Sequence, residues 1–221
     1  MTDVSLIVPV SGEPERERAW DWLRPSYEAT GWEIVECPDT ATEWSKGRAV
    51  NPGVAMSSGN RLIIADADLY IDLDVLGCAL DLLGNGAAWV VPHKTVYRLA
   101  PRATRALRAM PEPPLPSPTI SRHHLGPVGG GFVVCTRSAF DEVHGIDPRF
   151  TGWGGEDISF GWALDTLVGK HTRLDAPTWH MHHPPMQRFA GRASPENEWL
   201  AGRYADARGE PVAMRAICEE H

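Results

Sequence analysis

No stretch of the sequence holds the roughly 18 consecutive apolar residues that a bilayer-spanning helix needs. The first ten residues also lack a basic start followed by a long apolar run, which is the pattern of a secretion signal. We therefore expect a cytoplasmic protein without a transmembrane segment. Internal repeats and a polar linker between two cores are missing as well, which favours a single domain over residues 1–221.

Cysteines are few and scattered, because none of the four lies close to another and no C-x-x-C pair exists. We expect buried free thiols rather than disulfides or a thiolate metal site. The net charge of −8 argues against a general nucleic-acid-binding surface. The segment from Lys94 to Leu125 is an exception, since it holds six basic residues and a single acidic one.

Strand-like and helix-like segments alternate through the first 91 residues. Apolar runs predict strands, and apolar residues at helical spacing predict the helices between them. The expected strands cover residues 4–10, 32–37, 62–65 and 87–91, and the expected helices cover 13–29, 46–58 and 73–84. Pro25 should kink or shorten the first helix, and Gly59 should end the second. This order predicts an α/β fold with a mostly parallel central sheet flanked by helices.

The alternation stops after residue 92. Residues 98–125 are rich in arginine and proline, and we expect an insertion there whose proline-rich part forms a loop or lid. Further elements are expected downstream of the insertion. They are a strand at 132–135, helices at 138–143 and 156–168, an extended segment at 173–180 and a final helix that begins at Ser194.

Two acidic residues, Asp66 and Asp68, follow the third expected strand directly. They lie at the sheet edge where ligands of α/β proteins collect, and both carboxylates of an extended D-x-D segment point to the same side. A divalent cation relieves their repulsion, and oxygen ligands suit Mg²⁺ or Mn²⁺. A solvated loop and a D-x-D phosphatase are the alternatives, although the phosphatase pattern has Thr or Val where this chain has Tyr70.

A basic segment precedes the acidic pair by one helix. Lys46 and Arg48 lie near the expected start of that helix, and helix starts attract anions. The pair can therefore meet a diphosphate, and a solvated basic turn is the alternative.

A glycine-rich segment with a tryptophan and two acids spans residues 150–157. Its glycines permit close backbone approach or positive φ angles, and Trp153 can offer a flat face to a sugar ring. Glu156 and Asp157 open a helix, whose dipole favours their ionised forms, and a general base must be ionised. The alternative is an ordinary helix start beside a core tryptophan.

Three histidines lie within four residues, at His180, His182 and His183. In a strand the first two would share one face and the third would point the other way. A neutral imidazole can complete a metal site of carboxylate and diphosphate oxygens, so the cluster favours metal binding over a purely structural role.

These segments together resemble a GT-A glycosyltransferase over about residues 4–183. They follow in the order V-P at the end of a strand, K-G-R-A-x-N-x-G, D-A-D, G-G-G-F, F-x-G-W-G-G-E-D-x-x-F-G and W-H. The segment 152–161 resembles β-1,4-galactosyltransferases, chondroitin-polymerase-type transferases and polypeptide N-acetylgalactosaminyltransferases.

The resemblance implies a metal site and a donor site. Asp68 and His180 would bind the metal together with His183, with His182 and Asp66 as alternatives, and Asp66 would otherwise contact the ribose or a metal-bound water. Residues with an implied role at the donor nucleotide or its sugar are Pro9, Asp39, Lys46, Arg48, Gly130, Gly131, Trp153 and Gly155. Pro9 and Asp39 match the base-binding positions loosely, because the second strand ends in C-P-D.

The implied activity is transfer of a sugar from a nucleotide diphosphate donor, with UDP favoured, to an acceptor hydroxyl with the help of Mn²⁺ or Mg²⁺. Asp157 matches the general base of inverting members, and Glu156 would bind donor or acceptor hydroxyls. Retaining relatives usually carry Asn at the position of Asp157, so inversion is favoured. A non-catalytic domain that binds a nucleotide sugar or a glycan is the alternative function.

Two further expectations concern the acceptor and a lid. Arg98, Arg102, Arg105 and Arg108 can line one side of a helix, either as a solvated face or as a surface for an acidic acceptor. Such an acceptor would be a nucleic acid, a phospholipid-linked substrate or an anionic glycan. Residues 183–195 have the composition of a lid that orders when donor binds.

Overall fold

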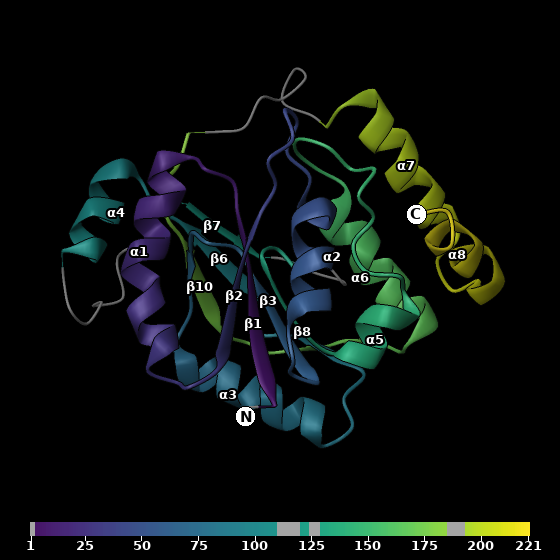
Figure 1. The fold of residues 1–221 in the computed structure, drawn as a ribbon, viewed down its shortest axis with the longest axis horizontal. Coiled ribbons are helices and arrows are strands. Elements are labelled where there is room, and N and C mark those ends of the chain that lie inside the picture. The colour runs from purple at the N-terminus through teal and green to yellow at the C-terminus, as the bar shows by residue number, and fades with distance from the viewer. Residues whose placement is uncertain (1–2, 110–119, 124–128, 185–192) are drawn as a thin grey trace.

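The computed structural model describes residues 3–109, 120–123, 129–184 and 193–221 (Figure 1). These residues form two sheets. The central sheet has the order β2-β1-β3-β8-β5-β9. Its strands are β1 (Val4–Val10), β2 (Glu33–Pro38), β3 (Arg61–Ala65), β5 (Trp89–Val91), β8 (Phe132–Thr136) and β9 (Thr172–Arg173). The second sheet consists of β4 (Leu69–Tyr70), β10 (Pro177–His180), β6 (Thr95–Arg98) and β7 (Ile120–His123), in that order.

The central sheet is parallel except at one strand. β1 runs parallel to β2 and β3, and β5 runs parallel to β9. β8 lies between β3 and β5 and is antiparallel to both. The inner strand β1 is mostly apolar because helices cover both faces of the sheet, and Leu6, Ile7 and Val8 are fully buried in succession. Charged residues occur in the edge strands β2 and β9, at Glu33, Glu36 and Arg173. The predicted α/β class with a mostly parallel central sheet is confirmed.

Helices cover the two faces of the central sheet in two groups (Figure 1). α1 (Pro14–Glu28) and α3 (Leu73–Gly84) share one apolar core with the side chains of Leu6 and Val8. The other core joins Ile7 to the helices α2 (Lys46–Met56), α5 (Arg137–Glu142) and α6 (Glu156–Leu167). The last two helices, α7 (Pro195–Asp206) and α8 (Pro211–Cys218), pack against α6. No described helix is long and apolar enough to cross a bilayer.

The first helix has the expected extent, and the expected end of the second is wrong. α1 is not shortened at Pro25 and continues to Glu28, because Tyr27 beyond the proline is buried in the same core as Trp20. α2 ends at Met56 with Ser57 as its C-cap, and not at a glycine cap. Gly59 instead lies against β1, where its N–H donates to Ser5 Oγ at 2.8 Å.

The basic region is more structured than its composition predicts. β6 and α4 (Pro101–Arg108) form within it, while residues 110–119 and 124–125 of the predicted insertion lie outside the described residues. The predicted row of four arginines on one helix is wrong, because Arg98 belongs to β6. Arg108 is paired with Glu15 at 3.3 Å, which leaves Arg102 and Arg105 as the exposed arginines of α4.

The second sheet brings the end of β10 beside the D-x-D segment. The expected extended segment 173–180 is divided, since β9 belongs to the central sheet and β10 to the second. β10 pairs with β4, with His180 opposite Leu69. The next residue, Met181, donates its N–H to the carbonyl oxygen of Asp68 at 2.9 Å. A ladder of backbone hydrogen bonds therefore places His180 next to Asp68.

Gly47 should be needed for α2 to pack closely on the turn before Arg149. A Cβ atom at Gly47 would lie 2.5 Å from Ile146 O and 2.8 Å from Pro148 Cα, which are backbone atoms that cannot rotate away. We expect Gly47→Ala to lower the free energy of unfolding by about 1–3 kcal/mol, the usual effect of overpacking. Urea denaturation measures this change.

Gly77 in α3 is the matched control, because a Cβ there meets nothing within 4 Å. Gly77→Ala should raise the free energy of unfolding by about 0.5–1 kcal/mol, since alanine favours a helix interior. Equal stability of Gly47→Ala and the wild type would contradict the close approach of α2 to the turn.

Candidate metal centre and active site

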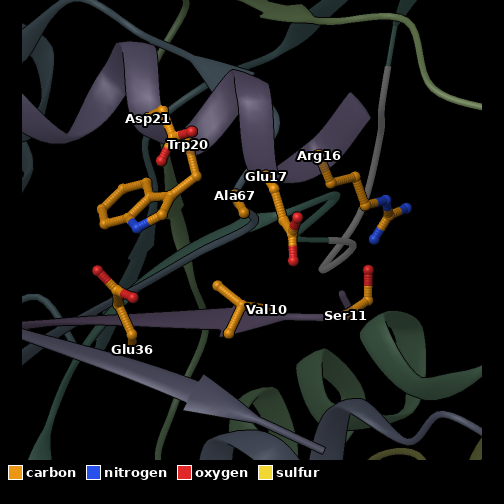
Figure 2. A pocket seen from close by; sticks show the side chains of 8 residues that line it. All are labelled: Val10, Ser11, Arg16, Glu17, Trp20, Asp21, Glu36 and Ala67. Atoms are coloured by element: carbon orange, nitrogen blue, oxygen red, sulfur yellow. The ribbon is translucent and has the colours of Figure 1, made fainter. Parts of the chain in front are cut away.

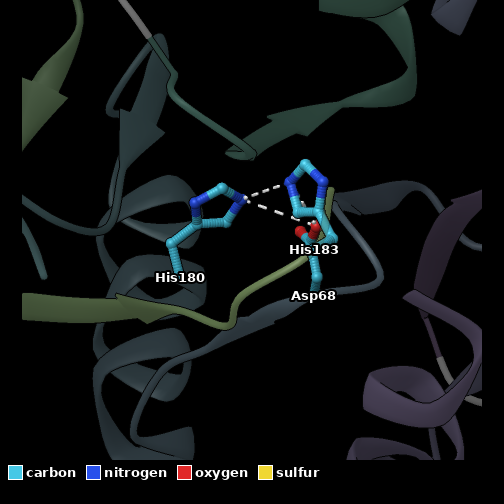
Figure 3. A group of neighbouring side chains, drawn as sticks. All are labelled: Asp68, His180 and His183. Atoms are coloured by element: carbon cyan, nitrogen blue, oxygen red, sulfur yellow. Dashed lines mark hydrogen bonds and ion pairs between the residues drawn. The ribbon is translucent and has the colours of Figure 1, made fainter. Parts of the chain in front are cut away.

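Asp68, His180 and His183 converge at the junction of the two sheets (Figure 3). One ligand atom from each residue lies within 4.8 Å of the other two. His183 Nε2 is 3.3 Å and His180 Nε2 is 3.5 Å from Asp68 Oδ2, and the two Nε2 atoms are 3.2 Å apart. A carboxylate and two imidazoles that aim their ligand atoms at one point form a donor set suited to a divalent metal ion.

The carboxylate of Asp68 is buried and poorly satisfied. Asp68 is 1% exposed, and neither of its oxygens accepts a hydrogen bond from the described residues. Burial would raise the pKa of this carboxyl, but His180 and the guanidinium of Arg16, 3.2 Å away, lower it well below its usual range. Arg16 compensates the charge of Asp68, but the buried oxygens accept no hydrogen bond from the described residues, so the residues present fit a divalent cation.

The two imidazoles differ in their second contacts. His183 Nδ1 lies 2.7 Å from the carbonyl oxygen of Pro184, which can only accept, so Nδ1 carries the hydrogen. The Nε2 atom of His183 accepts from Arg16 Nη2 at 3.2 Å beside Asp68, so metal binding there would have to displace this contact. Burial and the charge of Arg16 lower the pKa of His183, which favours this neutral form. His180 Nδ1 lies 2.7 Å from Arg98, which can only donate. Coordination through His180 Nε2 would therefore require the contact with Arg98 to change.

The two alternative metal ligands lie outside this group. Among the described residues, His182 belongs to no such cluster, and its backbone N–H donates to Thr104 Oγ1 at 2.8 Å. The expected alternation of faces does not apply to it, because β10 ends at His180. Asp66 points its carboxylate at Lys46 instead, with 2.7 Å between Oδ1 and Nζ.

Lys46 connects Asp66 to the predicted general base. Its ammonium lies 2.7 Å from Asp66 Oδ1 and 2.9 Å from Asp157 Oδ1, and 9% of the side chain is exposed. Burial alone would lower the pKa of Lys46, but Asp157 and Asp66 outweigh it and raise the pKa above its usual value. The predicted contact of Lys46 with a diphosphate stays a prediction, and it would have to form beside two carboxylates.

Arg48 and Asp39 form an ion pair near the start of α2. Asp39 accepts hydrogen bonds from Arg48 Nη2 at 2.9 Å and from the backbone N–H groups of Ser45 and Ala41 at 2.7 and 3.1 Å. Pro9, near the end of β1, lies beside Cys37 of β2. The roles of these residues at the donor nucleotide stay predictions.

The glycine-rich segment before α6 adopts the backbone that its composition predicts. Gly152, Gly154 and Gly155 have φ angles of 69°, 101° and 100°, which residues with a side chain rarely adopt. Gly155 caps α6, so Glu156 and Asp157 occupy its first turn. Trp153 between these glycines is 39% exposed, among the most exposed large apolar side chains described. A partly exposed tryptophan thus lies a few residues before the predicted base.

The glycine pair before β8 packs against the D-x-D segment. Gly131 accepts a hydrogen bond from the backbone N–H of Asp66 at 2.8 Å. Its φ is +100°, and a Cβ atom there would lie 2.9 Å from Asp66 Oδ2. Gly130, with φ of 56°, precedes it. The contact of these two glycines with the donor sugar stays a prediction.

Glu156 differs from the expected ionised acid. Burial, followed by the nearby charge of Asp157, raises the pKa of Glu156 to about 7. Near neutral pH the helix start therefore does not keep this carboxyl fully ionised, because burial and the charge of Asp157 raise its pKa. A protonated Glu156 can donate a hydrogen bond, which suits the predicted contact with a substrate hydroxyl better than a second base would.

The raised pKa of Glu156 predicts a pH-dependent stability. A carboxyl that ionises at about 7 in the folded protein and near 4.5 when unfolded stabilises the fold below pH 4.5 and loses that effect as the pH rises to 7. Relative to Glu156→Gln, the wild type should therefore lose stability across this interval and differ by a constant amount above it. Urea denaturation at several pH values measures the difference. Glu198→Gln, in the first turn of α7, is the control, and parallel curves for the wild type and Glu156→Gln would contradict the shift.

A cavity of about 250 Å³ lies between α1 and the ends of β1 and β2 (Figure 2). It borders the metal group, because Arg16 lines it and Ala67 lies between the two acids of D-x-D. Its remaining lining residues are Val10, Ser11, Glu17, Trp20, Asp21 and Glu36. Arg16 is a site residue that the sequence analysis missed, since an arginine on a charged helix surface carries no recognisable signal.

Comparison with known proteins supports the resemblance. A family model described as the N-terminal domain of galactosyltransferase matches residues 119–184, which include the G-W-G-G-E-D segment and the histidines of the metal group. No curated protein matches the chain at the level of sequence. The match to the family model covers less than half of the chain.

Solved glycosyltransferases share the fold. TarS residues 1–349 from S. aureus is 14% identical with a TM-score of 0.61, covering 99% of this chain and 70% of that one. GalNAc-T7 with UDP, GalNAc and Mn²⁺ is 15% identical with a TM-score of 0.57, covering 99% of this chain and 54% of that one. The catalytic domain of Drosophila β-1,4-galactosyltransferase 7 with xylobiose is 15% identical with a TM-score of 0.53, covering 88% and 77%. The fold is therefore that of GT-A glycosyltransferases, as predicted.

Proposed function

We propose, from the GT-A fold that it shares with these transferases, that the protein is a metal-dependent glycosyltransferase. It moves a sugar from a nucleotide diphosphate donor, of which UDP is favoured, to an acceptor hydroxyl. The observation that carries this proposal is the convergence of Asp68, His180 and His183 at the edge of the sheet. Lys46 links that edge to Asp157, because its ammonium group forms ion pairs with both Asp66 and Asp157.

The metal group would hold Mn²⁺ or Mg²⁺ through Asp68, His180 and His183. A divalent cation there offsets the negative charge that builds on a leaving diphosphate. Support for manganese comes from the solved structures. GalNAc-T7 was solved with UDP, GalNAc and Mn²⁺, and the mannosyltransferase PcManGT from Pyrobaculum calidifontis with GDP-Man and Mn²⁺. The two nucleotides differ between these proteins, so the donor of this chain must be tested against both.

Asp157 is the proposed general base. Its carboxylate lies at the start of α6, directly after the loop with Trp153, and Lys46 holds its Oδ1 at 2.9 Å. It would take the proton from the acceptor hydroxyl as that oxygen attacks the anomeric carbon from the face opposite the diphosphate, which inverts the configuration. Trp153 would pack against a sugar ring, and Glu156 would donate to a substrate hydroxyl.

A panel of nucleotide sugars tests the proposal directly. We expect at least one UDP-, GDP- or other nucleotide-linked sugar to be hydrolysed slowly without acceptor, and this hydrolysis should stop with EDTA and return with Mn²⁺. Binding of a donor without any turnover would favour the non-catalytic alternative instead. If no donor in the panel is bound or hydrolysed, the transferase proposal and the non-catalytic alternative are both contradicted.

The proposed acceptor is acidic, because α4 presents basic residues. Arg102 and Arg105 of α4 are exposed, which is compatible with an acidic acceptor such as a nucleic acid, a phospholipid-linked substrate or an anionic glycan. Transfer that weakens steeply with salt and becomes insensitive to salt when both arginines are replaced by alanine would support such an acceptor.

A further inference from the structure

The loop that carries Trp153 has an irregular backbone that needs external hydrogen bonds. Three of its residues between 152 and 155 have positive φ, so its N–H and C=O groups cannot pair as in a helix or a strand. Partly buried backbone groups of this kind are satisfied by side chains or by distant backbone. One such contact comes from the α2 side, where Gly152 N–H donates to the carbonyl oxygen of Trp44 at 2.7 Å.

Further contacts come from a side chain of α7, Asn197. Its Nδ2 donates to Thr151 O at 2.8 Å and to Gly154 O at 2.9 Å, with Trp153 O at 3.5 Å. Its Oδ1 accepts from Thr151 N–H at 3.3 Å. Asn197 is 2% exposed, and it lies more than 40 residues after the loop in the sequence.

An asparagine suits this position chemically. One planar amide offers two N–H donors and an accepting oxygen, so it can bind carbonyl groups and an N–H group of the same loop at once. Aspartate has the same shape but no donor, and its charge would face the carbonyl oxygens of Thr151 and Gly154. The backbone of Asn197 is itself held at the start of α7, because its N–H donates to Ser194 Oγ at 3.1 Å.

We infer that Asn197 is the positioning residue of the acceptor side of the site. It holds residues 151–154 in the conformation that orients Trp153 and leads through Gly155 into the first turn of α6, where Asp157 lies. This inference rests on the proposed function for its catalytic consequence, but the contact itself does not. The donor nucleotide and metal, on the far side of Lys46, should be bound equally well without it.

The test combines hydrogen exchange, binding and kinetics for Asn197→Ala and the isosteric Asn197→Asp. In both variants the amides of residues 151–155 should exchange about tenfold faster, because a local opening becomes easier. Binding of UDP with Mn²⁺ should change by less than about threefold. The kcat/KM for the acceptor should fall by about 10- to 100-fold, because even a small displacement of a group that positions the substrate reduces the rate by about this factor.

Tyr204→Phe is the matched control. Tyr204 is a buried residue of the same helix, and its hydroxyl donates to Asp147 Oδ2 at 3.0 Å and not to residues 151–155. This variant loses a buried hydrogen bond and should leave exchange at 151–155 and acceptor kinetics unchanged. Unchanged exchange in both Asn197 variants overturns the inference whether or not the protein is a transferase. Faster exchange with unaltered acceptor kinetics in an active protein overturns it too.

If the wild-type protein turns over no donor, the proposed function is contradicted instead. The exchange result would then still decide whether Asn197 holds the loop. If Asn197→Ala fails to fold, Asn197→Asp supplies the same measurements, because it keeps the volume of the side chain.

Discussion

Replacing Asp157 by Asn will reduce the rate of sugar transfer by about 10²- to 10⁴-fold, the usual effect of removing a general base. The substitution keeps the shape of the side chain and removes its capacity to accept a proton. Lys46 retains Asp66 as a charged partner at 2.7 Å, so the local structure should persist. The rate is measured with saturating donor and Mn²⁺ over a range of acceptor concentrations.

The loss should appear in kcat and leave binding of UDP with Mn²⁺ within about threefold of the wild type, because only the chemical step needs the base. Asp165→Asn is the control, since it removes an acid from the last turns of the same helix, where Asp165 pairs with His171. Transfer by Asp157→Asn at more than a third of the wild-type rate would exclude Asp157 as the base.

The second large effect is expected from Asp68→Asn. Asp68 is the only carboxylate among the three grouped ligands, and its buried oxygens lack hydrogen bonds from the described residues. Loss of a residue that only hydrogen-bonds to a metal ligand weakens metal binding by roughly 10- to 100-fold. Removing the charge of the ligand Asp68 itself should weaken Mn²⁺ binding by more than that. Metal-dependent donor hydrolysis should fall in parallel. Calorimetric titration with Mn²⁺ measures the affinity without reference to activity.

Asp66→Asn is the comparison that gives this prediction its specificity. The two acids are separated by one residue, but Asp66 contacts Lys46 and lies outside the metal group. We expect Asp66→Asn to change Mn²⁺ affinity by less than about tenfold, because it alters only a neighbouring charge. A thermal shift gives a second readout, since Mn²⁺ at about 100 times its Kd should stabilise the wild type by roughly 2.7 kcal/mol and Asp68→Asn much less. Equal losses in the two variants would contradict the grouping of Asp68 with the histidines.

Local patterns predicted the parts of the site that depend on residue type. The apolar run before D-x-D identified a buried strand, and the glycines around Trp153 identified a left-handed backbone. The cluster of three histidines predicted metal binding from its composition. The resemblance then assigned His180 and His183 as ligands, and the structure brings both to Asp68. Each of these signals lies in a short segment, where side-chain chemistry and backbone preference act together.

Features that depend on long-range packing could not be predicted in the same way. The insertion of β8 between β3 and β5 in the reverse direction leaves no trace in periodicity, because a buried strand looks alike in either direction. The ion pairs of Lys46 join three distant segments. Asn197 is one polar residue in an ordinary amphipathic helix, and only its buried position shows its four contacts with the loop.

The chain passes from the central sheet to the second sheet within the D-x-D segment. One part of the site is therefore attached to each sheet. Asp66 is tied to the central sheet through Gly131 O, and Lys46 and Asp157 follow the helices on that sheet. Asp68 is tied through its carbonyl oxygen to Met181, one residue beyond the end of β10 in the second sheet. A small rotation of one sheet against the other would keep the geometry within each part and alter the span between metal and base. In the proposed transferase, the packing of the two sheets against each other would therefore set the distance between the metal group and Asp157.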